Sequence, residues 1–254
     1  WPEMSVHHVE AVMGTSISID LVDTHDRALV DRLVEWFHHV DDVFSPYKET
    51  SPITRIGRGE ATDEELTDEI LEVLERCDEL ADDSDGVFDV WNLPSPNGTR
   101  FDPCGYVKGW SVQRAAEMVT AEGVRDFCLN AGGDVVLSGR NRDGDQWRVG
   151  VRHPHDPQLV ALVLHGEGPL AVATSGTYER GAHIVDPRKG EAVTELASVT
   201  VVGPNIAEAD AYATTVFAMG LDGLEWLARH DGYEAAVITH DMRLLTTPGM
   251  AAYR

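Results

Sequence analysis

Apolar residues along the first half of the chain recur every three or four positions, which is the repeat of one helical face. This spacing predicts a helix over 26–43 and a second from Thr62 to about Leu80, opened by a capping pattern. A third helix is expected over 109–122, because Gly123 directly after it is a natural stop. The first half of the chain is therefore predicted to be mainly helical.

Strands dominate the second half. One early segment, 16–21, alternates polar and apolar residues as a half-buried strand does. Seven later segments are predicted as strands: 126–130, 134–138, 147–151, 159–164, 169–173, 197–202 and 234–239. Helices near 207–219 and 222–229 lie between the last two strands, and turns are expected at 141–144 and 187–190. Because helices come first and strands follow without a regular βαβα alternation, the predicted fold class is α+β, in one compact domain.

The charge of the chain limits its partners. Asp and Glu number 44 and Lys and Arg 20, so the formal net charge is −24 at pH 7. Nucleic acids and anionic lipid surfaces attract clustered Lys and Arg, so neither is expected as a partner. If a phosphate-bearing ligand binds, a metal cation or backbone N–H groups must supply most of the attraction.

Apolar runs and cysteine spacing indicate in which cellular compartment the protein is expected. The sequence has no run of about 18 or more apolar residues, so no transmembrane helix is predicted. Cys77, Cys104 and Cys128 show no CxxC spacing, which argues against a disulfide framework or a zinc site. No secretory leader is evident. Together these features predict a cytoplasmic protein with one domain over 5–254 and a cloning or processing remnant at 1–4.

Common phosphate-binding and hydrolase motifs are absent, since the chain has no GxxxxGK[ST], no GxGxxG after a strand, no GxSxG and no HExxH. Small, acidic and hydroxyl residues instead cluster at four places. The first is 102–109, where Asp102, Gly105 and Lys108 surround the start of the third helix. A helix N-terminus with glycines and a lysine suits a polyphosphate, and a tight turn with a surface lysine is the alternative.

The second and third clusters are weaker. Paired glycines within 130–134 favour a simple strand-end turn, and 174–178 is a hydroxyl-rich turn followed by His183. We interpret His183 either as a base beside a nucleophile or as a satisfied histidine next to a capped turn.

The fourth cluster lies at a predicted helix start. Asp210 and Thr214 are four residues apart, so their oxygens share one helical face, and two such oxygen donors suit Mg²⁺. The alternative is that Asp210 is only a favourable charge near a helix N-terminus.

In their order and spacing these residues resemble the FAD:protein FMN transferases, the ApbE family. Eight short segments match the family in sequence order: Met13–Thr15, Phe44–Tyr47 with Ser51, Gly86–Asp89, Asp102–Gly109, Asn130–Asp134, Thr174–Arg180, His183–Pro187 and Ala209–Thr214. They cover nearly the whole chain. The resemblance implies a single α+β domain with a mixed or antiparallel sheet and flanking helices.

The resemblance also implies a reaction. Members of this family take FAD as a substrate and Mg²⁺ as a cofactor, move the FMN moiety onto a threonine hydroxyl of a target protein and release AMP. By the family pattern, Asp210 and Thr214 ligate Mg²⁺ through side-chain oxygens and Gly105 through its main-chain carbonyl. The implied catalytic residues are Asp210 and His183, with His183 acting on the incoming threonine.

Nine residues match family positions that line the FAD site: Met13, Tyr47, Val87, Phe88, Asp89, Asp102, Lys108, His183 and Ile184. The acceptor is expected to be a separate protein with a short Ser/Thr motif, because no copy of that motif is evident in this chain. Two alternatives remain open. One is an Mg²⁺-dependent FAD pyrophosphatase giving FMN and AMP, and the other is an FAD-binding protein without catalysis.

Overall fold

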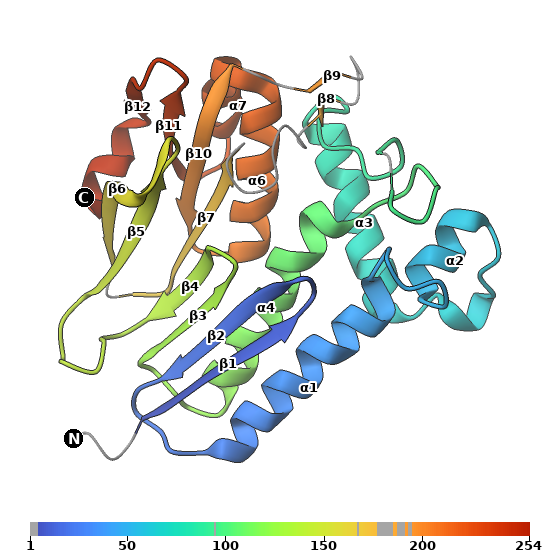
Figure 1. The fold of residues 1–254 in the computed structure, drawn as a ribbon, viewed down its shortest axis with the longest axis horizontal. Helices are drawn as coiled ribbons and strands as arrows, with labels where there is room; N and C mark the ends of the chain where they lie inside the picture. Colours follow the sequence, from blue (N-terminus) through green and yellow to red (C-terminus); the bar gives the residue numbers. More distant parts are fainter. Residues whose placement is uncertain (1–4, 94, 167, 177–184, 187–190, 193–194) are drawn as a thin grey trace.

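One antiparallel sheet organises the fold, with its strands in the order β1-β2-β3-β4-β7-β10-β11-β12 (Figure 1). The computed structural model describes residues 5–93, 95–166, 168–176, 185–186, 191–192 and 195–254. The sheet strands are β1 (Val6–Val12), β2 (Thr15–Leu21), β3 (Phe127–Ala131), β4 (Asp134–Ser138), β7 (Leu170–Gly176), β10 (Leu196–Gly203), β11 (Glu234–Thr239) and β12 (Leu244–Thr246). Two separate pairs are β5 (Trp147–His153) with β6 (Asp156–Gly166), and β8 (Val185–Asp186) with β9 (Glu191–Ala192).

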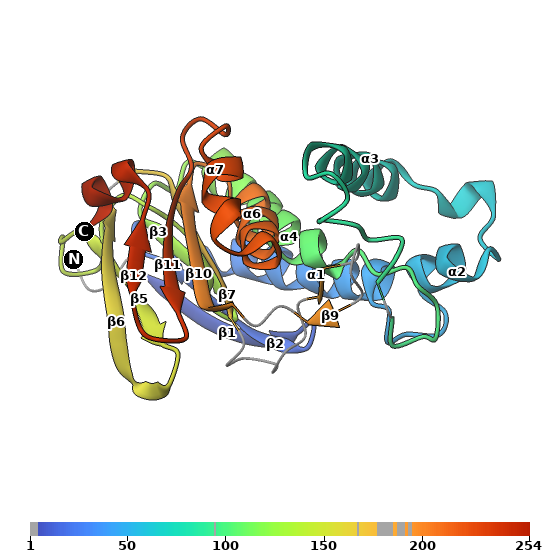
Figure 2. The same ribbon diagram turned by 90° about the horizontal axis from the view of Figure 1, so that it is seen from above.

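Helices form the second layer. The α-helices are α1 (Arg27–Phe44), α2 (Pro52–Arg58), α3 (Asp68–Asp83), α4 (Cys104–Ala121), α6 (Ile206–Met219) and α7 (Gly223–Leu227). Short 3₁₀ turns are η1 (Asp63–Glu65), η2 (Gly220–Asp222) and η3 (Pro248–Tyr253). Figure 2 shows α1, α4 and α6 side by side along the sheet.

The middle strands of the sheet are covered on both faces. Because side chains alternate along a strand, Val136 and Ala171 join the apolar core on the helical side, whereas their neighbours Val135 and Val172 join a second core. That second core includes Leu162 and other residues of the β5–β6 hairpin. The hairpin therefore covers the face of the middle strands opposite the helices.

The predicted α+β class and its antiparallel sheet are confirmed. The helix expected over 26–43 is α1, and Asp26 caps it by accepting hydrogen bonds from the N–H groups of Ala28 and Leu29. Each of the seven later segments predicted as strands overlaps an observed strand.

Two predicted helix boundaries are wrong. The capping pattern at Thr62 opens only the single turn η1, and α3 starts separately at Asp68 behind its own cap, Thr67. A four-residue capping pattern fits one turn as well as a long helix, which explains the error. The third helix begins at Cys104, five residues before the prediction, because Asp102 Oδ1 accepts the Cys104 N–H at 2.9 Å. The turn predicted at 187–190 lies outside the described residues.

None of the helices within the described ranges is both long enough and apolar enough to span a bilayer.

Candidate active site

Helices α4 and α6 approach each other at a glycine. A Cβ atom on Gly109 would lie 2.7 Å from the Ile206 carbonyl oxygen and 2.9 Å from both Ala207 Cα and Asp210 Cβ. Only a residue without a side chain fits this crossing. The close approach brings Asp210 of α6 beside Lys108 of α4.

Lys108 lies between two buried carboxylates. Its Nζ forms an ion pair with Asp134 Oδ2 and lies 3.7 Å from Asp210 Oδ1. Asp134 is 1% exposed and Asp210 is 5% exposed, whereas the Lys108 side chain keeps 32% exposure. The ammonium thus links the first residue of β4 to the second turn of α6, and the lysine side chain is partly exposed.

Hydroxyl groups complete the arrangement one turn further along α6. Thr214 Oγ1 lies 3.2 Å from Ser175 Oγ at the end of β7. The preceding residue, Thr174, donates its N–H to Asp134 Oδ1 at 3.2 Å. We refer to Lys108, Asp134, Ser175, Asp210 and Thr214 as the Lys108 cluster.

The chemistry of the Lys108 cluster fits a divalent cation with a preference for oxygen. Two carboxylates face one ammonium, so the cluster carries a net negative charge, and the remaining donors are hydroxyl oxygens. Groups of three or more His, Cys, Asp or Glu side chains arranged for a metal are absent from the described residues. This donor set lacks the nitrogen and sulfur ligands of zinc sites and suits Mg²⁺, which keeps several waters and ligand oxygens.

Gly105 and Phe88 are also brought together. A Cβ on Gly105 would lie 3.5 Å from the Phe88 ring, so the first turn of α4 rests on that ring. Val87 and Phe88 are buried, and the Phe88 N–H donates to Ser84 Oγ at 2.9 Å. The predicted segment 87–89 therefore borders the end of α4 that carries Gly105, one of the metal-ligand candidates.

Asp89 and Asp102 shape the chain on either side of this contact. Asp89 Oδ1 accepts the Trp91 N–H at 2.8 Å, which closes a local turn. The Asp102 N–H donates to the Val90 carbonyl at 2.8 Å, and its carboxylate accepts the N–H of Cys104, the first residue of α4. Both side chains are engaged in local hydrogen bonds, and their assignment to the FAD site stays a prediction.

Met13 and Tyr47 lie in loops. Met13 occupies the β1–β2 turn with φ of 55°, and its Sδ is 3.8 Å from the Ser111 hydroxyl on α4. Tyr47 follows α1 and is 75% exposed, so its ring faces solvent. Their flavin contacts stay predictions. The predicted His183 and Ile184 lie outside the described residues.

The comparisons with known proteins bear on this arrangement. The ApbE family profile matches residues 13–95 and 91–237, which is most of the chain. This chain belongs to the ApbE family. Its fold is similar to the flavin transferase ApbE from Vibrio cholerae, with a TM-score of 0.86 and 22% identity over 98% of this chain and 99% of that chain. The fold is also similar to that of the ApbE protein from Thermotoga maritima, with a TM-score of 0.85 and 20% identity over 98% of this chain and 99% of that chain.

Curated relatives of this ApbE-family chain carry the name FAD:protein FMN transferase. The Vibrio cholerae protein is 34% identical over 122 residues, covering 44% of this chain and 36% of the relative. The Rhodobacter capsulatus protein is 35% identical over 162 residues, covering 60% of this chain and 31% of the relative. The aligned stretches thus span about a third of the length of those relatives.

Glu208 has a different role from Asp210, the other acidic residue nearby on α6. Arg76 of α3 donates to both of its carboxylate oxygens, with Nε 2.9 Å from Oε1, and this hydrogen-bonded pair raises the pKa of Arg76. Burial and the nearby Glu208 carboxylate raise the pKa of Tyr212. Glu208 therefore ties α3 to α6 and is not part of the Lys108 cluster.

Two members of the cluster were not singled out from the sequence. Asp134 lies within the matched segment 130–134, which we interpreted as a simple strand-end turn, and Ser175 lies in the hydroxyl-rich turn. The available signal was an acidic residue directly after paired glycines at the start of an apolar strand. Their roles depend on contacts with Lys108 and Thr214, which are distant in sequence.

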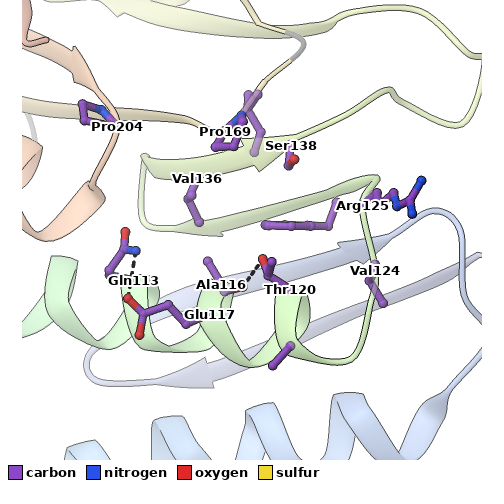
Figure 3. A pocket seen from close by; sticks show the side chains of 13 residues that line it. Gln113, Ala116, Glu117, Thr120, Val124, Arg125, Val136, Ser138, Pro169 and Pro204 are labelled. Atoms are coloured by element: carbon purple, nitrogen blue, oxygen red, sulfur yellow. Dashed lines mark hydrogen bonds between the residues drawn. The ribbon is translucent and has the colours of Figure 1, made fainter.

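An open pocket of about 500 Å³ lies elsewhere on this ApbE-family fold, between the later turns of α4 and strand β4 (Figure 3). Its lining includes Ala116, Thr120, Val136, Pro169 and Pro204. None of the predicted site residues lines this pocket, so the candidate active site is the Lys108 cluster at the other end of α4.

Proposed function

We propose that this chain is an Mg²⁺-dependent FAD:protein FMN transferase, which moves FMN from FAD onto a threonine of a separate target protein and releases AMP. We assign the activity to a single domain over 5–254. One structural observation carries the proposal: Asp210 lies beside Lys108 and Gly109 of α4, and Thr214 follows one helical turn later, next to Ser175. The names of the relatives support it.

The proposed reaction is a phosphoryl-type transfer. The threonine Oγ forms a bond to the phosphorus atom of the FMN moiety, the bond from that phosphorus to the bridging oxygen breaks, and AMP leaves with that oxygen. The hydroxyl proton passes to a base, a role that the family pattern gives to His183. Such transfers need mainly positioning and charge stabilisation from the protein.

The residues of the chain divide this work. Asp210, Thr214 and the Gly105 carbonyl would hold Mg²⁺, which when bound neutralises charge on the diphosphate. Lys108 is partly exposed and presents an ammonium to an anionic substrate from the same place. Val87 and Phe88 wall the start of α4, and exposed Tyr47 offers an aromatic face for a ring of FAD. A local cation also explains how a chain of net charge −24 binds an anionic dinucleotide.

The direct test is the intact mass of a candidate acceptor domain after incubation with this protein, FAD and Mg²⁺. We expect a gain of one FMN phosphoester that is abolished by EDTA. FMN and AMP in the supernatant without acceptor modification would reassign the chain as a pyrophosphatase. FAD binding without either product, tested with a Ser/Thr acceptor that a relative modifies, would reassign it as a flavin-binding protein.

Asp210→Asn separates the metal role from a structural one. The change is nearly isosteric but removes the charge, so we expect FMN transfer at saturating FAD to fall at least about a hundredfold while the urea unfolding midpoint changes little. Glu208→Gln is the matched control on the same helix. It should lower the unfolding midpoint by weakening the pair with Arg76 and leave the Mg²⁺ dependence of transfer intact. Equal losses in the two variants would contradict the assignment of Asp210.

A further inference from the structure

Lys108 lies at different distances from its two neighbouring carboxylates, and this difference affects whether Asp210 can bind the proposed metal ion. Its Nζ is closest to Asp134 Oδ2, whereas 3.7 Å separates it from Asp210 Oδ1. The longer separation exceeds an ordinary N–H···O hydrogen bond, although the two charges still attract each other. Asp134 therefore holds the ammonium, and Asp210 is its second neighbour.

Asp134 is fixed by the backbone around it. Gly132 and Gly133 have φ of 61° and 105°, and Asn130 Oδ1 accepts the Gly133 N–H at 2.8 Å, which closes the turn before β4. The Asp134 carboxylate is then held by the Thr174 N–H at 3.2 Å. A buried carboxylate that follows a fixed turn and accepts a backbone hydrogen bond is a rigid anchor for the flexible lysine side chain.

We propose that Asp134 is a positioning residue: it anchors Lys108 and so keeps the ammonium beyond hydrogen-bonding distance of Asp210, which lets a divalent cation compete for the Asp210 carboxylate. This inference rests on the proposed function, because it assigns Asp210 to the metal. The ammonium and the cation compete for the Asp210 carboxylate. By holding the ammonium, Asp134 favours binding of the cation.

A competing explanation is general charge. Asp134 attracts a cation through space whether or not Lys108 is present, and that contribution would survive removal of the lysine. Anchoring of Lys108, in contrast, has no effect on the metal once the lysine is gone. A double-mutant cycle of Asp134→Asn and Lys108→Met therefore separates the two explanations.

The measurement is the affinity for Mn²⁺ alone, followed by the electron paramagnetic resonance signal of the free ion. Asp134→Asn retains an oxygen that can accept from Thr174, and we expect it to weaken Mn²⁺ binding about tenfold. In the Lys108→Met background the same change should weaken binding by less than about threefold. Lys108→Met alone should bind Mn²⁺ at least as tightly as the unchanged protein, and Glu208→Gln should bind it equally well.

Three results would overturn the inference: a tenfold loss in both backgrounds, no loss in either, or weaker Mn²⁺ binding on Lys108→Met alone. Urea unfolding of each variant checks the fold, and weaker Mn²⁺ binding on Lys108→Met alone would overturn the inference even if Asp134→Asn does not fold. FMN transfer to an acceptor is measured in parallel on the unchanged protein. If the unchanged protein transfers FMN but Asp134→Asn binds Mn²⁺ as tightly as it does, only the role of Asp134 is disproved. If the unchanged protein binds Mn²⁺ but neither transfers FMN nor releases AMP, the proposed function is disproved.

Discussion

At the residue scale, neighbouring acids on one helix differ because of what the rest of the fold places against them. Glu208 faces Arg76 of α3 in a two-point ion pair, whereas Asp210 faces the more distant ammonium of Lys108. Both are acidic and largely buried, with exposed side-chain fractions of 15% and 7%. Their sequence context alone does not separate a structural acid from a candidate metal ligand.

This explains which parts of the site could be predicted from the sequence. The order of short motifs identified Lys108, Asp210 and Thr214 as candidates through the family resemblance, and the structure places these three in one cluster. Asp134 was interpreted as part of a turn because its partner, Lys108, comes from another element. A local pattern contains no information on such a pairing, so only the folded arrangement reveals it.

Cys77 allows a prediction on pH. This thiol on α3 is fully buried, and burial raises its pKa above the ordinary value of 9.0. Above about pH 9 the unfolded chain releases the proton that the folded chain retains, so this contribution to stability is fully present below pH 9 and is lost as the pH rises. Between pH 9 and 11 the unfolding free energy should fall less steeply in Cys77→Ala, by up to about 1.4 kcal/mol per pH unit.

Urea unfolding at each pH measures this slope. The comparison uses slopes and not midpoints, because the alanine also leaves a small cavity that lowers stability at every pH. Parallel slopes for the two proteins would show that Cys77 titrates normally in the folded state.

At the element scale, the crossing of α4 and α6 determines whether the site can form. Gly109 stands where the two backbones are closest, and Lys108 precedes it directly. Any side chain at this position must push α6 away and carry Asp210 with it. The packing of the two helices and the geometry of the Lys108 cluster are therefore linked through one residue.

Gly109→Ala tests that link. Its Cβ would overlap the α6 backbone, at 2.7 Å from the Ile206 carbonyl, so we expect a loss of about 1–3 kcal/mol in unfolding free energy. Mn²⁺ binding should weaken as well. Gly105→Ala is the matched control for stability, since its Cβ would meet Phe88 at an ordinary 3.5 Å. A Gly109→Ala protein as stable as the Gly105→Ala protein would show that the helices can separate at no cost.

Elements long enough to show several periods of the apolar pattern could be predicted from the sequence, whereas short elements could not. The 18-residue helix α1 carries a clear apolar stripe and was predicted to within one residue at each end. The seven-residue α2 and the three-residue β12 are too short for a repeat, and neither was predicted. Strand β1 was missed because apolar Val9 is 54% exposed, whereas polar His8 and Glu10 occupy half-buried positions, so the strand lacks the usual alternation of apolar-inward and polar-outward residues.

For the whole molecule, the net charge of −24 is the dominant electrostatic feature. Several basic side chains pair with acids across the surface, such as Arg32 with Glu122 and Arg114 with Glu72. Since acids outnumber bases by more than two to one, most of the acidic charge has no basic counterpart. Mutual repulsion among these carboxylates opposes the compact state.

Salt should therefore stabilise this protein. Raising NaCl from about 0.1 M to 1 M shortens the Debye length from about 10 Å to 3 Å, which screens the repulsion. We expect the thermal unfolding midpoint to rise over this range. Changing exposed Asp31, Glu35 and Glu75 to lysine moves the net charge toward zero and should reduce the rise. A midpoint that falls with NaCl would mean that the surface ion pairs outweigh the net repulsion.

The fold class was predictable from the order of helices and strands, whereas the sheet order was not. Placing β7 between β4 and β10 requires knowing that the intervening β5–β6 hairpin leaves the sheet and covers its other face. The apolar runs of β7 and β10 indicate burial on both faces but not which element supplies each cover.

The distribution of the Lys108 cluster along the chain has a consequence for biosynthesis. Its members come from α4, β4, β7 and α6, so no stretch of a growing polypeptide contains the complete set until Thr214 has been made. A nascent chain on the ribosome therefore cannot assemble the proposed cation site early. If the proposed site binds a cation only in the native state, that cation adds to stability by mass action, and metal supply would help determine how much mature protein persists.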